Sequence, residues 1–317
     1  MPSPNDPMNL IRRLGQGKNP KKLSLSVDAE GYTIMHDILF PTVPEGIVSG
    51  RLGPFEIRSA GGRIVPTFEG LVFDYVDFTG SDFQNSRWVD CDFTHVKMNR
   101  INGFGMNFTN SRIRHSSFIQ ANLSRANWGW KNPPYPLVED CTFERTDLRN
   151  TTHTQPIFRR CRFTDCRFKG TRLSARFEDC VFEGVVADVG FGTKTRDRGV
   201  TTTWNQMKNV DFTRAELRHV AFCGGIDLRS CKFPEKGYVH IPRPDLVYPR
   251  LLEAVRRSWS SPEREKVTKY LEQLIRLCFR EEQPLDIINE DDMPGIFGEE
   301  TGRRLVNELK QVSESIG

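Results

Sequence analysis

The sequence lacks several features that define common classes of protein. Its 317 residues contain no run of eighteen apolar residues, so we expect no membrane-spanning helix. Arg12 and Arg13 are followed by no apolar segment, which argues against a secretory signal. Lys and Arg number 45 and Asp and Glu 41, and the formal net charge of +4 is too small to indicate nucleic-acid binding by itself. These absences predict a cytoplasmic protein.

The cysteines form no metal-binding motif. No Cys-x-x-Cys pair occurs, and the closest two cysteines, Cys161 and Cys166, are five residues apart. Six of the eight lie two residues before a regularly spaced phenylalanine: Cys91, Cys141, Cys161, Cys166, Cys180 and Cys231. We therefore expect reduced cysteines that fill small apolar spaces, with no disulfide, metal or cofactor.

A large apolar residue recurs at every fifth position. The stretch FDYVDFTGSDFQNSRWVDCDF carries Phe73, Phe78, Phe83, Trp88 and Phe93. A helix would need apolar spacings of three and four, and a strand would need every second residue. The same phase continues through the chain, interrupted twice by a slip of one residue, at Phe68, Met98, Phe108, Ile113, Phe118, Leu123, Trp128, Phe143, Leu148, Phe158, Phe163, Phe168, Leu173, Phe177, Phe182, Met207, Phe212, Leu217, Phe222, Leu228 and Phe233.

A period of five indicates a coil with four sides. The residue two before each large centre is small or β-branched in most repeats, as in Ser81, Ser86 and Ala121. For the same two positions of every five residues to point inward, the chain must turn a corner after each short strand. Four such sides form a closed coil of twenty residues. Coils then stack at a spacing of about 4.8 Å, and their large residues form the core. We expect an all-β solenoid over residues 66–240.

The repeat resembles that of the pentapeptide repeat family, written A-[DN]-[LF]-x-x. The matching segments are SDFQN (81–85), CDFTH (91–95), ANLSR (121–125), TDLRN (146–150) and VDFTR (210–214). The resemblance covers residues 66–235 and implies a right-handed quadrilateral β-helix. It also implies a bacterial protein without enzymatic activity in the repeat. Some members bind DNA gyrase, but those relatives are strongly acidic and this chain is not.

Two segments interrupt the repeat, at residues 129–140 and 189–206. The first keeps the phase but contains three prolines and the aromatic residues Trp130 and Tyr135. We interpret it as a loop on one side, with aromatic side chains that either contact a partner or fold back over the coil. The second contains Lys194, Arg196 and Arg198 among glycines, which predicts a mobile basic loop. It lacks the GK[ST] ending of a phosphate-binding loop.

The flanking segments have other patterns. We expect a flexible segment over residues 1–22 and an N-terminal β-rich cap over 23–65. The helical spacing of apolar residues after 241 predicts a C-terminal unit of three helices over 241–317, with the second capped by Ser261 and the third over 302–313. This unit could cap the solenoid, form a homodimer or bind a partner.

Basic residues are concentrated between residues 159 and 176. This segment contains seven basic residues and one acidic residue. The four-sided coil should distribute the basic residues around its circumference, and we call this set the basic belt: Arg159, Arg160, Arg162, Arg167, Lys169, Arg172 and Arg176. We expect a non-enzymatic scaffold that binds a protein with an acidic surface through this belt, the two loops and the helical unit. The alternative interpretation is that the belt keeps the coil soluble. Nucleic acid is the weaker candidate ligand, because a belt follows a strand poorly.

Two other functions are alternatives to a general binding scaffold. A topoisomerase-interacting or toxin-neutralising protein is a more specific form of binding protein. An enzyme would need a cluster of nucleophile and base, which the sequence does not show. His95 and His115 are twenty residues apart and should stack at one corner of adjacent coils. Without a third ligand, we expect two solvated histidines and no metal.

Overall fold

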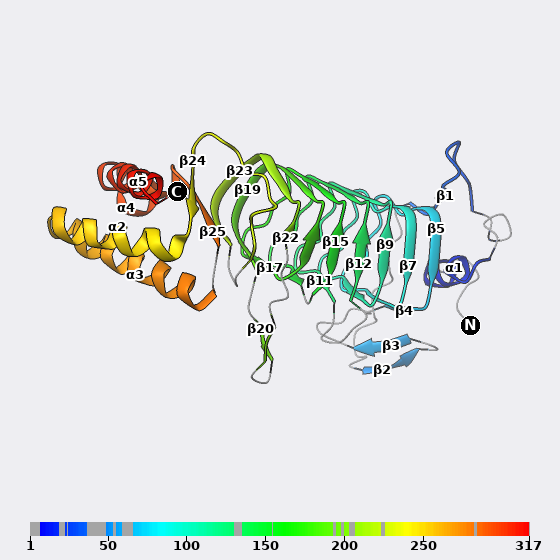
Figure 1. Cartoon of the computed structure of the whole chain (residues 1–317). Helices are drawn as coiled ribbons and strands as arrows, with labels where there is room; N and C mark the ends of the chain where they lie inside the picture. The colour runs from blue at the N-terminus through cyan, green and yellow to red at the C-terminus, as the bar shows by residue number, and fades with distance from the viewer. Residues whose placement is uncertain are drawn as a thin grey trace. The chain divides into compact units, whose positions relative to one another are not determined.

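The computed structural model of the chain divides into two compact units, Met1–Arg176 and Phe177–Gly317 (Figure 1). It describes residues 7–18, 23, 25–36, 49–52, 55–58, 66–129, 135–153, 155–192, 195–197, 200–202, 207–222, 226–281 and 284–316. Within these residues, no helix combines the length and apolar character needed to span a bilayer.

The first unit consists of one helix followed by short strands. The helix is α1 (Pro7–Gly15). The strands are β1 (Thr33–Ile34), β2 (Ser49–Leu52), β3 (Phe55–Arg58), β4 (Thr67–Glu69), β5 (Val72–Asp77), β6 (Arg87–Val89), β7 (Asp92–Lys97), β8 (Asn107–Thr109), β9 (Arg112–Arg114), β10 (Ser117–Ile119), β11 (Asn127–Trp128), β12 (Leu137–Glu139), β13 (Thr142–Glu144), β14 (Thr152–His153), β15 (Ile157–Arg159), β16 (Arg162–Thr164) and β17 (Thr171–Leu173).

The strands from β4 onward stack as parallel coils of twenty residues. Phe73 of β5 lies opposite Phe93 of β7, and Phe93 lies opposite Ile113 of β9. The regularly spaced large residues form the core, and Phe68, Phe78 and Trp88 are completely buried. The rings stack from coil to coil, as for Phe118 and Phe143, whose centroids are 4.8 Å apart. Burial of each ring contributes about 1.5–3 kcal/mol. The predicted quadrilateral β-helix is confirmed.

A left-handed backbone conformation makes the corners of the coil. It occurs two residues after most centres, as at Asn85, Asp90 and His95, with φ values of 56°, 52° and 52°. This conformation costs a residue other than glycine about 1–2 kcal/mol, and Asn and Asp tolerate it best. Each corner returns the next pair of inward positions to the core. The side chain at the corner points outward, so corner residues of successive coils form columns on the surface.

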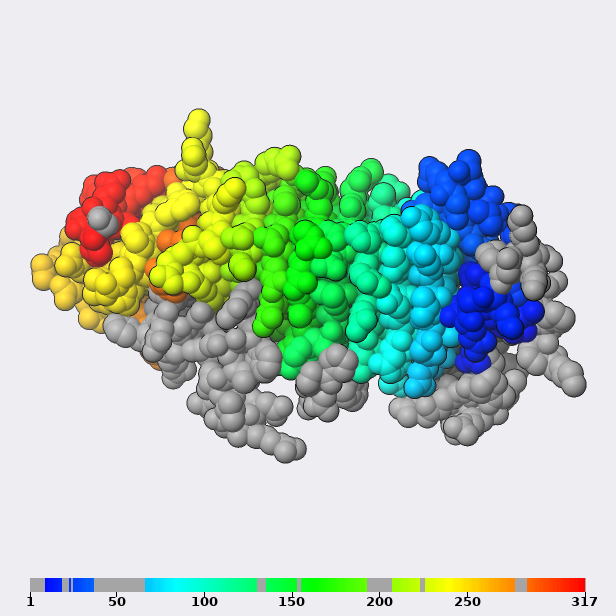
Figure 2. Space-filling view, turned by 45° about the vertical axis from the view of Figure 1, so that its right-hand side comes forward, coloured from blue at the N-terminus to red at the C-terminus, as the bar shows by residue number. Residues whose placement is uncertain are grey.

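The interruption at residues 129–140 adds one pentapeptide to a coil. Phe93 pairs with Ile113, twenty residues later, whereas Ile113 pairs with Val138, twenty-five residues later. Phe118 and Phe143 show the same longer step. Because the extra length equals one repeat, the five-residue phase survives the interruption. In Figure 2, residues 66–129 cover the coils in successive bands from cyan to green.

The N-terminal segment differs from the prediction. Residues 1–22 were expected to be flexible, but α1 occupies Pro7–Gly15 within them. Ile11 is completely buried, and the space beside Gly15 is filled by Leu71 and Phe73 of the first coil. Within the segment 23–65 that was predicted to be β-rich, β1 pairs in parallel with β5. The helix was missed because its apolar face is only about two turns long.

The second unit continues with longer strands and then helices. Its elements are β18 (Arg176–Glu178, which begins at the last residue of the first unit), β19 (Val181–Phe191), β20 (Thr195–Asp197), β21 (Val200–Thr202), β22 (Met207–Lys208), β23 (Asp211–Phe222), β24 (Tyr238–Pro242), α2 (Pro244–Ser258), α3 (Glu263–Glu281), β25 (Leu285–Asn289), α4 (Asp292–Phe297) and α5 (Glu299–Glu314). Phe191, in the segment predicted to lack a centre, is buried and stacks on Phe222.

The helical part of the second unit has its own core. Val247, Leu251, Val255, Val267 and Leu305 are buried together. Three of its helices match the predicted ones, but α4 and the antiparallel pair β24–β25 were missed. The pair joins strands more than forty residues apart, a long-range contact that local periodicity does not reveal.

Candidate protein-contact surface

A column of stacked side chains occupies one corner of the first unit. The ring centroids of Tyr75 and His95 are 4.3 Å apart, and those of His95 and His115 are 5.1 Å apart, with interplanar angles of 18° and 14°. The expected stacking of the two histidines is confirmed. Tyr75 joins them because it occupies the same corner one coil earlier. About half of the His115 side chain remains exposed.

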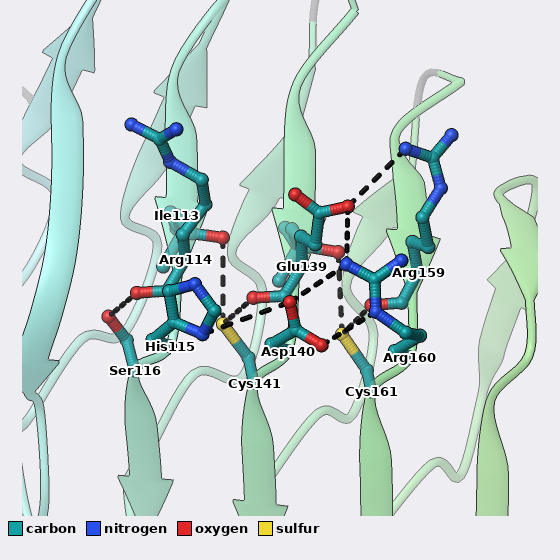
Figure 3. Close-up of polar contacts among 11 residues, drawn as sticks. Ile113, Arg114, His115, Ser116, Glu139, Asp140, Cys141, Arg159, Arg160 and Cys161 are labelled. Carbon is teal, nitrogen blue, oxygen red and sulfur yellow. Dashed lines mark hydrogen bonds and ion pairs between the residues drawn. The ribbon is translucent and has the colours of Figure 1, made fainter.

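The column continues into charged residues across the added pentapeptide. The corner after His115 is Asp140, whose Oδ2 lies 3.8 Å from His115 Nδ1. Arg160, one coil further, donates hydrogen bonds to both Asp140 oxygens, at 2.8 and 2.9 Å (Figure 3). These hydrogen bonds lower the pKa of the Asp140 carboxyl. The sequence alone missed this continuation because a step of twenty from His115 ends at Tyr135 rather than at Asp140.

The described residues contain no cluster of three or more metal-ligating side chains. The carboxylate nearest to the histidine pair is Asp74, whose Oδ1 is 3.3 Å from His95 Nδ1. The imidazoles of His95 and His115 lie face to face in the column.

The first part of the predicted basic belt is paired within the chain. Arg159 Nη1 lies 3.3 Å from Glu139 Oε1, and Arg160 Nη2 lies 2.8 Å from the same oxygen. Figure 3 shows both arginines reaching toward the preceding coil. The charge balance of residues 159–176 does not include Glu139 and Asp140, because these acids lie about twenty residues earlier in the sequence. The belt is therefore weaker at β15 than the sequence indicated.

The remaining belt residues lie on different sides of the coil, as predicted. Arg162 is in β16 and Arg172 in β17, and Arg167 lies opposite Asp147 between them. These three side chains and Lys169 are exposed, while Arg176 is half-buried.

Asp147 interacts with two arginines, Arg149 and Arg167. Its carboxylate accepts hydrogen bonds from Arg149 Nε at 2.9 Å and Arg149 Nη2 at 2.6 Å. Burial raises the pKa of Asp147, but the bonds from Arg149 outweigh it, and the pKa is lowered overall. One negative charge beside two positive charges leaves this side of the coil with an excess of positive charge.

The residues predicted in the loops are only partly described. Tyr135 is half-buried beside β12. Trp130, Lys194 and Arg198 lie outside the described residues. Arg196 belongs to β20, which pairs with β21 as an antiparallel hairpin, but its side chain lies outside the described part.

The described cysteines occupy the predicted filler positions. All six carry thiols, and five are buried. Their sulfur atoms donate hydrogen bonds to carbonyl groups of the preceding coil, such as Cys141 Sγ to Ile113 O at 3.5 Å. Burial raises the pKa of Cys91 to about 11 and that of Cys166 to about 12. These thiols are structural rather than reactive.

The geometry defines the class of protein as a β-helix built from five-residue repeats with an extended, charged outer surface. Residues 69–102 match the family model described as "Pentapeptide repeats (8 copies)". This part of the chain consists of pentapeptide repeats, as its own sequence pattern had indicated.

Solved structures with the same type of fold show low similarity in detail. HetL, described as a pentapeptide repeat protein involved in heterocyst differentiation regulation from the cyanobacterium Nostoc sp. strain PCC 7120, is 11% identical, with a TM-score of 0.23. The comparison covers 53% of this chain and 83% of HetL. Full-length QnrB1, described as a plasmid-mediated fluoroquinolone resistance protein, is 11% identical, with a TM-score of 0.19, over 53% of this chain and 82% of QnrB1. No curated protein matches the chain.

Proposed function

We propose that the protein is a non-enzymatic scaffold of the bacterial cytosol that binds another protein with an acidic surface. The observation that carries the proposal is the set of exposed basic side chains around the last coils of the first unit: Arg162, Arg167, Lys169 and Arg172. They project from a stack of coils whose core is continuous, so little backbone conformational entropy is lost on binding.

The proposal assigns the belt a contact role and the coil a supporting role. Backbone hydrogen bonds between coils fix the positions of the side chains, as in Arg167 N to Thr146 O at 3.0 Å. Basic side chains arranged in this way would speed the encounter with an acidic surface and make binding sensitive to salt. The described cysteines carry thiols, which supports a reducing compartment.

The test is affinity capture from the native host, followed by binding measurements with the captured partner. The variant carries Arg162→Glu, Arg167→Glu and Arg172→Glu together, and circular dichroism confirms its fold. We expect weaker binding and a smaller loss of affinity at raised salt than for the unmodified protein. Arg112→Glu is the matched control, because Arg112 is equally exposed on β9 outside the belt. An unchanged affinity for the triple variant would remove the belt from the binding surface.

A further inference from the structure

The last long strand of the coils, β23, is bonded differently on its two edges. One edge pairs in parallel with β19, where Leu217 lies opposite Val186. The N–H and C=O groups of Leu217 itself face the other edge, where side chains rather than a strand bind them. An edge of this kind is a template for pairing with another chain unless it is covered. We call residues 216–219 the terminal edge.

Two side chains that follow the coils take the place of a next strand at Leu217. The Leu217 N–H donates to the Tyr238 hydroxyl at 2.8 Å, and the side-chain amide of Asn289 donates to the Leu217 carbonyl. Asn289 Oδ1 accepts the Asp291 N–H at 2.9 Å, which fixes the orientation of the amide. Tyr238 begins β24 and Asn289 ends β25. One acceptor and one donor thus complete the two hydrogen bonds that a strand would make to this residue.

The corner at the end of the terminal edge is bonded to α4. Asp292 Oδ2 accepts the His219 N–H at 2.8 Å, and Asp292 Oδ1 lies 3.7 Å from His219 Nε2. The other ring nitrogen of His219, Nδ1, lies 3.3 Å from Asp188 Oδ1 on β19. Three residues from three elements therefore cover the terminal edge, and we call them the latch: Tyr238, Asn289 and Asp292.

The latch joins two apolar cores that are packed separately. The coil beside the terminal edge buries Phe212, Leu217 and Phe222. The helical part has a core of its own, which includes Val247 and Leu251. The latch contacts are hydrogen bonds and an ion pair, so removing them leaves both sets of apolar contacts in place. The terminal edge can therefore be uncovered in a folded protein.

The terminal edge is complementary to itself. In an antiparallel pair centred on Leu217, the N–H and C=O of this residue bond to those of Leu217 in a second copy. Glu216 of each copy then lies opposite Arg218 of the other, and both side chains are exposed. Within one chain, Arg218 Nε donates to Glu216 Oε1 at 2.6 Å, so pairing exchanges one carboxylate partner for an equivalent one. Opposite charges across antiparallel strands stabilise the pair, and like charges destabilise it.

We propose that the terminal edge is an interaction surface for a second copy of this chain, and that the latch covers it. The helical part then acts as the cap that ends the stack of coils and prevents two copies from pairing edge to edge. This inference does not depend on the basic belt, because the latch and the terminal edge both lie in the second unit.

The test removes the latch from the full-length protein. The latch variant carries Tyr238→Phe, Asn289→Ala and Asp292→Ala together, and circular dichroism checks its fold. Tyr238→Phe alone is the second variant, because it removes the acceptor of one hydrogen bond and keeps the ring. Asp291→Ala is the matched control, since this neighbouring acid pairs with Arg303, 3.0 Å away.

Residue-resolved hydrogen exchange and sedimentation velocity measure the two consequences. At low protein concentration, the amide of Leu217 should exchange about tenfold faster in both variants than in the control, and that of His219 faster in the latch variant. At higher concentration, the latch variant should double its mass, and both amides should regain protection. The control should keep the mass and the exchange rates of the unmodified protein.

Two changes on the terminal edge test the antiparallel register. In the latch variant, Arg218→Glu places glutamates opposite one another and should abolish the dimer, and adding Glu216→Arg should restore it. Unchanged exchange at Leu217 in Tyr238→Phe, a latch variant that keeps the mass of the control, or a dimer that survives Arg218→Glu would overturn the inference. A dimer that does not return with Glu216→Arg would contradict the proposed register.

Discussion

Gly103 is a small residue at a position that usually carries a large one, and Met106 is a large residue at a position that usually carries a small one. This reversal allows a direct test of core packing. Both residues lie inside the coil, and Met106 is completely buried. A Cβ on Gly103 would lie 2.5 Å from Met106 Sδ and 2.8 Å from Leu123 Cδ2. The methionine therefore fills the space that the glycine leaves.

Each single substitution should destabilise the coil. Met106→Ala removes a buried side chain and should lower the free energy of unfolding by about 2–5 kcal/mol. Gly103→Leu overpacks the same space and should cost about 1–3 kcal/mol. In the double variant, leucine replaces the lost volume, and the cost should be smaller than that of Met106→Ala alone. The expected coupling energy is at least about 1 kcal/mol in the stabilising direction.

Chemical denaturation followed by tryptophan fluorescence measures the four proteins. Trp88 and Trp128 are completely buried on either side of Phe108 and report on the coils that contain Met106. The slopes of the transitions must agree before the free energies are compared, because repeat arrays can lose two-state behaviour. Additive costs for the two substitutions would refute the idea that one residue fills the space of the other.

Four further predictions concern the core, the buried thiols and the Asp140 carboxyl. Phe163→Asp should prevent folding, because it places an uncompensated charge in the core, whereas Arg162→Ser should leave the melting temperature nearly unchanged. Equal melting temperatures for the two variants would show that the five-residue phase is misassigned. Thiol titration should find Cys91 and Cys166 unreactive in the native protein near pH 8 and all eight cysteines reactive after denaturation. The pKa of the Cys91 thiol is about 11 in the folded protein and 9.0 ordinarily, so the thiol of the unfolded chain ionises first as the pH rises. The free energy of unfolding should therefore fall between these two pH values. An increase in the free energy of unfolding would contradict the burial of the thiol. Arg160→Ala should raise the pKa of Asp140 in a carbon-13 NMR titration by removing its hydrogen bonds, and an unchanged pKa would show that the pair does not form in solution.

The five-residue period predicted the repeat region because it reports directly on the core. Every coil repeats the same inward positions, so Phe73, Phe93 and Ile113 could be placed opposite one another from spacing alone. The His95–His115 stack followed from the same rule. Periodicity is informative here because each repeat meets only its neighbours.

Other features depend on contacts that the period does not encode. The pairing of Arg160 with Glu139 became visible only when the added pentapeptide was placed, because it changes which residues lie opposite one another. The short helix α1 and the pair β24–β25 have too few turns or too long a separation to leave a local pattern.

The contact role of the exposed basic side chains can be tested most directly by photo-cross-linking in the native host. A photoreactive amino acid replaces Arg167, Arg172 or the control Arg112, one at a time. We expect one partner protein to be cross-linked from positions 167 and 172 but not from 112, with adducts that diminish at raised salt. Adducts from position 112 alone, or no protein adduct from the belt positions in folded protein, would contradict the proposal that this surface binds a partner.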